Sequence, residues 1–412
     1  MTGTTPGIPR VLRTMNDRAA LHLLLTHGPL SRSRVGRLTG LSKPTASQLL
    51  ARLEAVDLVV ATGTSRGHPG PGAQLYALNP AAAHVAGLDV TADRIRAAVA
   101  DITGRTTGTF ELLTPRRQSS EPTVQRVVRA VEGAAEAAGL TLDRLHRVVI
   151  GTPGTFDPRS GRLRHAAHLP GWHSPALLEE LAAALPMPLD YDNDVNLVAV
   201  AEQRRGAARG HDDFVLLWNE QGIGAALVLG GRLHRGWTGG AGEVGFLPVS
   251  GAPPVRRGAR ANRGGFQELA GAGALLRLAR ELGIEPPPGP DGAGGADGAS
   301  AAALLARAAE SAGPDGGADG PYGELLRRTA TRLATGLAAT VAVLDPELVV
   351  LSGAVLTAGG EVLRSLVQRE LAELAVPRPR LVIGTVTEDP VLGGALESAL
   401  ATTRDEVFDT SR

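Results

Sequence analysis

Cysteine is absent from all 412 residues of the chain. This absence excludes disulfide bonds and thiolate metal sites, and it fits a reducing compartment. Aromatic residues are scarce, at 3%, so the cores must be built mainly from Ala, Leu and Val. No apolar run approaches the roughly 20 residues of a membrane-spanning helix, and the N-terminus lacks the apolar segment of a signal peptide. We therefore expect a soluble, cytoplasmic protein with no membrane partner.

Lysine occurs only once, as Lys43, and arginine supplies the rest of the positive charge. The formal net charge is zero, but it is unevenly distributed. Residues 1–80 contain nine basic and three acidic side chains, a net charge of +6, which leaves −6 on the remainder. A basic segment on an acidic body predicts a polyanion-binding module attached to another domain. The length also favours two or three domains over a single one.

The first 80 residues have the spacing of a helix-turn-helix. Residues 17–27 carry leucines at helical spacing. Ser31 is expected to cap a second helix in which Val35 and Leu38 point inward, and Gly40 closes it. This helix and the next one along the chain, joined by a turn at residues 39–41, form a helix-turn-helix. In that motif the later helix enters the major groove of DNA.

The helix that enters the groove, called the reading helix below, is expected over residues 43–55. Ser42 would cap it, and leucines would form its buried side. Strands at 58–61 and 74–78 flank a Gly/Pro-rich loop, which is the pattern of a wing. Polar side chains in the first half of the helix would read base edges, and arginines around it would contact phosphates. The expected DNA contacts are Arg32, Arg34, Ser42, Lys43, Thr45, Ser47, Gln48, Arg52 and Arg66. The alternative is a small helical domain whose basic residues are merely solvated.

The segment 31–59 resembles the DNA-binding head of ROK-family repressors, in which a Thr-Gly-Leu-Ser run starts the reading helix. In the wing, residues 65–69 resemble the family's Arg-Gly-Arg-Pro minor-groove hook. His68 replaces the second arginine of that hook. The resemblance therefore does not imply that the wing of this chain reads the minor groove.

After residue 81 the pattern becomes that of an α/β body. Three strands, at 85–90, 94–102 and 106–113, are followed by a helix at 123–138 and by further strands near 148–151 and 189. Strands at 214–218 and 225–229, a long helix at 325–344 and a strand before Gly353 repeat the arrangement, and a helix at 390–400 closes the chain. Such a repeat predicts two α/β lobes facing a cleft. Residues 285–321, rich in Pro, Gly, Asp and Ala, read as a flexible surface insertion with one short helix at 301–311.

Residues 219–245 are unusually rich in glycine and end in Glu243. Glycine at this density indicates backbone that lies close to a ligand or has positive φ. The stretch resembles the signature of the ROK family, which contains sugar kinases and sugar-responsive repressors. The resemblance implies an actin-like ATPase fold from about residue 81 to the end. We therefore expect a winged helix-turn-helix domain at 1–80 and a two-lobed sensor domain at 81–412.

The phosphate-binding turns of the family's kinases are altered in this chain. Their first turn, Asp-x-Gly-Gly-Thr, corresponds to a run from Asp89 to Ala92 that lacks both glycines. Their second turn, Gly-Thr-Gly, corresponds to Glu220, Gln221 and Gly222, where a carboxylate would repel a triphosphate. Phosphoryl transfer needs phosphate donors at such turns. We therefore predict that the chain is not an enzyme and uses no nucleotide cofactor.

The sugar side of the family's site is better preserved. Carboxylates and amides that converge on one point can bind the vicinal hydroxyls of a sugar. Taken singly, each residue could equally be a helix cap or a surface acid. By resemblance, the residues expected to bind the sugar are Gly154, Asn193, Asp194, Glu243 and Glu268.

The structural zinc of standard members has no counterpart here. Phe246 occupies the position of the family's histidine, and residues 256–263 contain arginines where the family has cysteines. We expect no metal, a more apolar pocket wall, and arginines that pair with acids or bind an anionic group such as a sugar phosphate.

The combined expectation is a ROK-type regulator, more often a repressor than an activator, that binds double-stranded operator DNA as a homodimer or tetramer and senses a sugar or sugar phosphate. A sugar kinase with a DNA-binding head is one alternative. A regulator whose body serves only for dimerisation is another.

Overall fold

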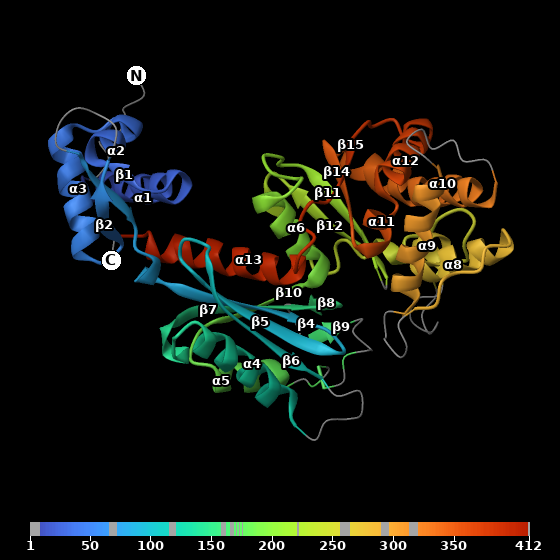
Figure 1. Cartoon of the computed structure of the whole chain (residues 1–412), viewed down its shortest axis with the longest axis horizontal. Coiled ribbons are helices and arrows are strands. Elements are labelled where there is room, and N and C mark those ends of the chain that lie inside the picture. Colours follow the sequence, from blue (N-terminus) through green and yellow to red (C-terminus); the bar gives the residue numbers. More distant parts are fainter. Residues whose placement is uncertain are drawn as a thin grey trace.

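In the computed structural model, the described residues are 9–65, 72–114, 121–157, 162–164, 169, 171–172, 174, 176–220, 222–255, 264–289, 296–312 and 320–410. They form a helical head and two α/β lobes, and a long C-terminal helix lies between the lobes and reaches the head (Figure 1). In this part of the chain, no helix combines the length and the apolar character needed to cross a bilayer.

The head is a helix-turn-helix with a small antiparallel sheet, as predicted. Its sheet has the order β1-β3-β2. Its elements are α1 (Pro9–His27), β1 (Leu30–Ser31), α2 (Arg32–Thr39), α3 (Lys43–Ala55), β2 (Val59–Thr64) and β3 (Gln74–Leu78). Residues 66–71 of the loop between β2 and β3, which include Arg66 and His68, lie outside the described residues.

Capping fixes both helices of the motif. The Ser31 hydroxyl accepts a hydrogen bond from the backbone N of Arg34 at 3.3 Å, and Ser42 does the same for Thr45 at 3.4 Å. Gly40 ends α2 with φ 72°, a conformation that glycine adopts without strain. The predicted caps are thus confirmed.

The prediction that Leu38 points inward is wrong, because its side chain is 40% exposed. The buried side of α2 consists of Val35 and Gly36. A Cβ on Gly36 would lie 3.0 Å from the carbonyl oxygen of Leu41, so the turn packs directly on this glycine. Close approach at Gly36 turns the next leucine away from the core.

The first lobe contains a five-stranded sheet of order β10-β7-β4-β5-β6. Strands β4, β5 and β6 are antiparallel, whereas β4, β7 and β10 are parallel. Helices α4 and α5 pack on one face, and a hairpin, β8 (Thr155–Asp157) and β9 (Arg162–Arg164), follows β7. The main elements are β4 (His84–Val90), β5 (Arg94–Asp101), β6 (Thr106–Leu113), α4 (Thr123–Ala137), β7 (Leu145–Thr152), α5 (Leu177–Ala184) and β10 (Leu189–Asn193).

The second lobe repeats this topology after helix α6 (Asp194–Arg205). Its sheet has the order β13-β12-β11-β14-β15, with the first three strands antiparallel and β11, β14 and β15 parallel. The strands are β11 (Phe214–Asn219), β12 (Ile223–Leu229), β13 (Arg232–Leu233), β14 (Leu348–Ser352) and β15 (Arg380–Ile383). The helices are α7 (Gly265–Ala270), α8 (Ala272–Glu281), α9 (Ala296–Ala312), α10 (Pro321–Leu344), α11 (Ala354–Ala358) and α12 (Gly360–Leu374). The predicted pair of α/β lobes is confirmed.

Helix α9 corrects the expectation of a surface insertion at 285–321. Its side chains at Ala301, Leu304, Leu305 and Ala308 are at most 1% exposed and belong to the core of the second lobe. Alanine and leucine suffice here because small side chains let α9 lie close to its neighbours. Residues 290–295 and 313–319, on either side of this helix, lie outside the described residues.

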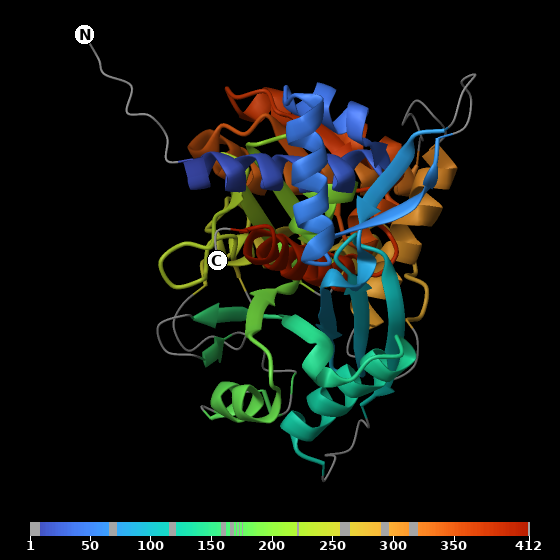
Figure 2. The same cartoon turned by 90° about the vertical axis from the view of Figure 1, so that its left-hand side faces the viewer.

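The last helix, α13 (Pro390–Val407), runs well beyond the predicted end at residue 400. It lies between the two lobes and ends at the head (Figures 1 and 2). Glycines allow it to approach its neighbours closely. A Cβ on Gly394 would lie 1.9 Å from the carbonyl oxygen of Leu197 in α6, and one on Gly87 in β4 would lie 3.0 Å from the backbone N of Leu396. The helix is therefore wedged tightly between β4 of the first lobe and α6.

Candidate functional site

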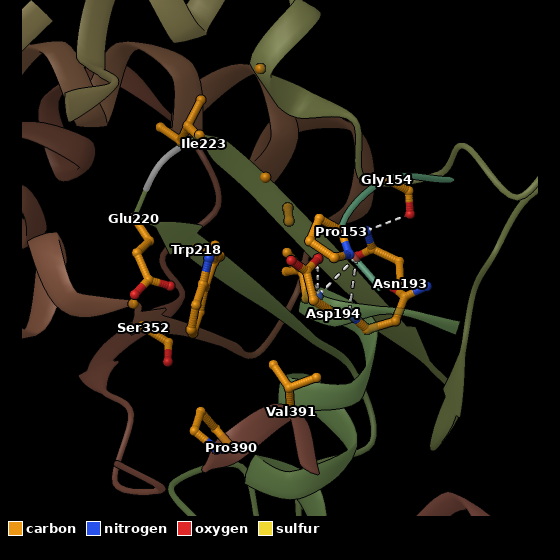
Figure 3. Close-up of a pocket in the computed structure, with 18 of the residues that line it drawn as sticks. Pro153, Gly154, Asn193, Asp194, Trp218, Glu220, Ile223, Ser352, Pro390 and Val391 are labelled. Atoms are coloured by element: carbon orange, nitrogen blue, oxygen red, sulfur yellow. Dashed lines mark hydrogen bonds between the residues drawn. The ribbon is translucent and has the colours of Figure 1, made fainter. Parts of the chain in front are cut away.

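A cavity of about 770 Å³ lies where the two lobes meet, within the roughly 300–1,000 Å³ typical of small-molecule sites. Its wall is formed largely by residues at or just after the carboxyl ends of strands (Figure 3). Asp89 is in β4, Pro153 follows β7, Asn193 ends β10, Glu220 follows β11 and Ser352 ends β14. Ligands in open α/β sheets bind at this edge.

Asn193 organises the first-lobe wall. Its side-chain oxygen caps α6 by accepting hydrogen bonds from the backbone N of Val195 at 2.9 Å and of Asn196 at 3.3 Å. Its Nδ2 donates to the carbonyl oxygen of Gly154 at 2.9 Å. Gly154 has φ 94°, which permits this close turn. Asn193 therefore holds the Gly154 loop in place, and both residues line the cavity.

Three carboxyl groups on the cavity wall have raised pKa values. Burial is the main cause in each case, because it disfavours the charged form. The pKa of Asp89 is raised to about 6, and that of Asp194 to about 7. The pKa of Glu220 is raised as well, and the charge of Asp89 adds to the effect of burial. The wall thus brings together carboxylates that repel one another.

An ion pair between a buried carboxylate and a half-exposed arginine ties the two lobes together beside the cavity. Asp192 of β10 is 6% exposed and accepts hydrogen bonds from Arg235, which follows β13, at 2.6 and 3.1 Å. Asp192 also accepts a bond from Asn196 at 2.8 Å. Sequence analysis did not single out this pair, since nothing local in the sequence joins positions so far apart.

The glycine-rich stretch brings Glu243 to the cavity. A Cβ on Gly242 would lie 2.0 Å from the carbonyl oxygen of Ala225, and the backbone N of Ala225 donates to Gly242 at 2.8 Å. Gly242 also has φ 95°. The expected close backbone approach is therefore found, and the next residue, Glu243, lines the cavity with Asp194.

Glu268 is not among the residues that line the cavity. Its carboxylate instead accepts a hydrogen bond from Arg277 at 2.6 Å. Its neighbour Gln267 lines the wall, and the Gln267 side-chain oxygen accepts a bond from the backbone N of Ile223 at 2.6 Å. The structure thus assembles four of the five expected sugar residues and replaces the fifth with a glutamine that no motif indicated.

The first altered phosphate turn is held by hydrogen bonds between its own residues. The backbone N of Thr91 donates to the carbonyl oxygen of Arg94 at 2.9 Å, and the Thr91 hydroxyl accepts from the backbone N of Arg94 at 3.2 Å. Thr91 and Ala92 both line the cavity. Gln221 of the second turn lies outside the described residues, whereas Glu220 faces the cavity (Figure 3).

Phe246 also lines the cavity. It adds an apolar side chain to the wall where the family has a histidine. Within the described ranges, no three His, Cys, Asp or Glu side chains are grouped so that they could hold a metal ion. The arginine-containing run at 256–263 lies outside those ranges.

The first half of α3 presents its polar side chains to solvent. Ser42, Lys43, Thr45 and Gln48 are exposed, and Ser47 is half-buried. This exposure leaves them accessible to a DNA groove.

The three arginines expected at phosphates differ in their surroundings. Arg32 donates to the Tyr76 hydroxyl at 2.8 Å, and Arg52 donates to Asp17 at 2.8 Å. Arg34 is exposed, and its side chain has no such partner among the described residues. Of these three arginines, Arg34 is therefore the one most readily available to a phosphate.

Comparison with known proteins assigns both parts of the chain. Residues 85–396 match the ROK family, and residues 14–68 match the MarR family. The xylose repressor of Caldicellulosiruptor bescii is 25% identical over 274 residues, which are 66% of this chain and 67% of that protein.

Two solved structures have the same fold. A ROK family transcriptional regulator, described as a homologue of the E. coli MLC protein, has a TM-score of 0.70 at 20% identity and covers 97% of this chain and 98% of its own. The ROK hexokinase of Thermus thermophilus has a TM-score of 0.62 at 27% identity and covers 78% of this chain and 100% of its own. The chain, with its MarR-type head joined to a ROK body, belongs to the ROK family and is a transcriptional regulator of that family.

Proposed function

We propose that this regulator represses transcription, that a sugar bound in the cavity releases it from DNA, and that it does not phosphorylate the sugar. It would bind a palindromic operator as a homodimer or a dimer-based tetramer, since two reading helices fit half-sites one helical turn apart. The repressors among its relatives support this direction of control. The observation that carries the proposal is helix α13, which lies against the cavity at one end and within the head at the other.

At the cavity end, α13 contributes directly to the wall. Pro390 and Val391 of its first turn line the cavity (Figure 3), and so does Asp389, which directly precedes the helix. Asp389, with φ 42°, forms an ion pair with Arg96 of β5, which also binds Glu111 of β6 at 2.6 Å. A ligand that changes the position of the first lobe therefore acts on the start of α13.

At the other end, the residues after α13 form part of the head. Phe408 is fully buried in one core with α1, α3 and the wing strands. Its ring meets that of His22 edge-on, with centroids 5.4 Å apart. The Thr410 hydroxyl donates to Asp17 at 3.2 Å, and Asp17 in turn binds Arg52 of α3. A continuous set of contacts thus leads from the cavity to the reading helix.

These contacts supply a means of coupling the two sites. A ligand shifts a conformational equilibrium only by binding one conformation better than the other. A sugar that bonds to both lobes would favour a closed cleft, and the wedged helix would then change the position of the head. Two heads of a dimer held at the wrong spacing cannot both occupy their half-sites.

The absence of phosphoryl transfer is directly testable. The closed Thr91 turn and the Glu220 carboxylate remove phosphate donors and add a negative charge on the nucleotide side. We expect no sugar-dependent ADP formation from the full-length protein with any of a panel of hexoses and pentoses. The same panel should contain a sugar that raises the melting temperature and weakens operator binding in fluorescence anisotropy. ADP formation that disappears in Asp194→Asn would show instead that the body is a kinase.

Lys43 and Arg34 should have separable effects on DNA binding. Replacing Lys43 with Ala, at the exposed start of α3, is expected to relax operator choice by about 1–3 kcal/mol at one base position. Replacing Arg34 with Ala should weaken binding to all sequences alike and flatten the slope of log affinity against log salt by about one unit. Anisotropy with a library of single-base operator variants, at two salt concentrations, measures both effects. If Lys43→Ala changes neither affinity nor specificity, α3 docks on DNA in another way.

A further inference from the structure

The charged side chains that the structure describes on the cavity wall are almost all acidic. Arg94 is the only base among the described lining residues. The acids among them are Asp89, Asp93, Asp194, Glu220, Glu243 and Asp389. Asp389 is neutralised by Arg96. The described part of the wall therefore favours a cationic group over an anionic one.

Three of these carboxyls have no ion-pair partner within the described part of the chain. They are Asp89, Asp194 and Glu220, and each has a raised pKa. Burial is the larger cause, and the charges of Asp89 and Glu220 both add to the rise at Asp194. Arg94 offsets part of this repulsion at Asp89 and Glu220. A positive charge on the ligand would relieve the repulsion that Arg94 offsets only in part.

An aromatic ring stands between these carboxyls. Figure 3 shows the Trp218 side chain beside the cavity, with Glu220 on one side of it and Asp194 on the other. The face of a tryptophan ring attracts an ammonium group within about 6 Å. A carboxylate next to such a ring suits a bound ammonium group, and the same carboxylate repels a phosphate group.

We propose that the ligand of this cavity is an amino sugar or a similar polyol amine, with its hydroxyl groups toward Asp194 and Glu243 and its ammonium group beside Trp218 and Glu220. In this arrangement the two lobes divide the ligand between them, since Asp194 starts α6 and Glu220 follows β11. This inference rests on the proposed function. Its test must therefore distinguish the contribution of the amine to binding from that of the sugar ring.

Binding of matched sugars to the full-length protein provides that test. Isothermal titration near neutral pH would compare glucose, galactose and mannose with their 2-amino and 6-amino derivatives, the N-acetylated forms and the 6-phosphates. For the ring that binds, an amino derivative is expected to bind at least tenfold more tightly than the parent sugar, because only the amine adds a charge complementary to the wall. N-acetylation of that amine, which removes its charge, should abolish the gain, and the phosphate should not bind.

Variants then locate the amine. Glu220→Gln should reduce the preference for the amino sugar over the parent sugar to less than threefold, because it removes the carboxylate proposed to face the amine. Glu268→Gln, a matched change outside the cavity wall, should leave the preference intact. Parent and amino sugars that bind equally would overturn this inference and leave the proposed function standing. A preference that survives Glu220→Gln would also overturn the assignment of the amine to Trp218 and Glu220. Failure of every sugar to bind would contradict the proposed function as well.

Discussion

Phe408→Ala should abolish tight operator binding while the ROK body stays folded and still binds its sugar. Truncation of a fully buried phenylalanine typically costs about 3–5 kcal/mol, and Phe408 is 0% exposed in the core of the head. The lost packing free energy belongs to the core that Phe408 shares with α1 and α3. The head should therefore unfold at a lower temperature than the body. Differential scanning calorimetry should therefore show a new transition at lower temperature, and anisotropy should show loss of operator binding.

Two further variants make this result interpretable. Leu371→Ala truncates a 1% exposed side chain in α12 of the second lobe, which should cost a similar free energy of about 2–5 kcal/mol without removing operator binding. Phe408→Leu keeps an apolar side chain and should lie between wild type and Phe408→Ala, which guards against a variant that fails to fold. Unchanged operator affinity in Phe408→Ala would mean that α13 does not hold the head.

Glu243→Ala should bind the operator normally yet resist release by the sugar. Glu243 lines the cavity together with Asp194 and is not part of the head. Loss of one hydrogen bond from a paired set, which leaves its partner unsatisfied, costs on the order of 1–3 kcal/mol. The sugar concentration for half-maximal release should therefore rise roughly tenfold to a hundredfold. A titration of sugar into the operator complex, followed by anisotropy, measures this shift.

Glu268→Ala is the matched control for Glu243→Ala. Both remove a glutamate expected from the family resemblance, but the Glu268 carboxylate binds Arg277 and is not part of the wall. Its dose–response should stay within about threefold of wild type, since an exposed ion pair contributes little. An equal shift in both variants, or a shift only in Glu268→Ala, would place the sugar elsewhere.

The local structure of the head could largely be predicted from the sequence. Serine before a helix and glycine after it have defined hydrogen-bonding roles, so Ser31, Gly40 and Ser42 could be placed without a fold. Leu38 was misplaced because helical spacing gives a periodicity but does not say which face another element approaches. In α2 that face is decided by contact at Gly36, which depends on the packing of the next turn.

The body shows where tertiary packing overrides composition. The alanine-rich segment around α9 reads as an insertion, yet Leu304 and Leu305 are at most 1% exposed within the second lobe. The extension of α13 to Val407 was missed for a related reason. Its last turns are polar in sequence, and only contact with the head explains why the helix continues and why Phe408 is buried.

Within the cavity, the family resemblance identified the right turns but not every side chain. Asn193 and Asp194 lie at a strand–helix junction that the sequence pattern locates. Gln267 and Glu268 are neighbours in one helical turn, and which of them faces the cavity depends on how α7 lies against β12. The pairing of Asp192 with Arg235 joins the two lobes and has no local signal at all.

The coupling of cavity and DNA is tested most directly by its reciprocity. If a sugar weakens operator binding by some factor, the operator must weaken sugar binding by the same factor. Isothermal titration of the sugar into the free protein and into the protein saturated with operator gives both dissociation constants. We predict that the operator raises the sugar dissociation constant by the factor, about tenfold to a hundredfold, by which the sugar weakens operator binding. Identical dissociation constants in the two titrations would show that the cavity does not control the head.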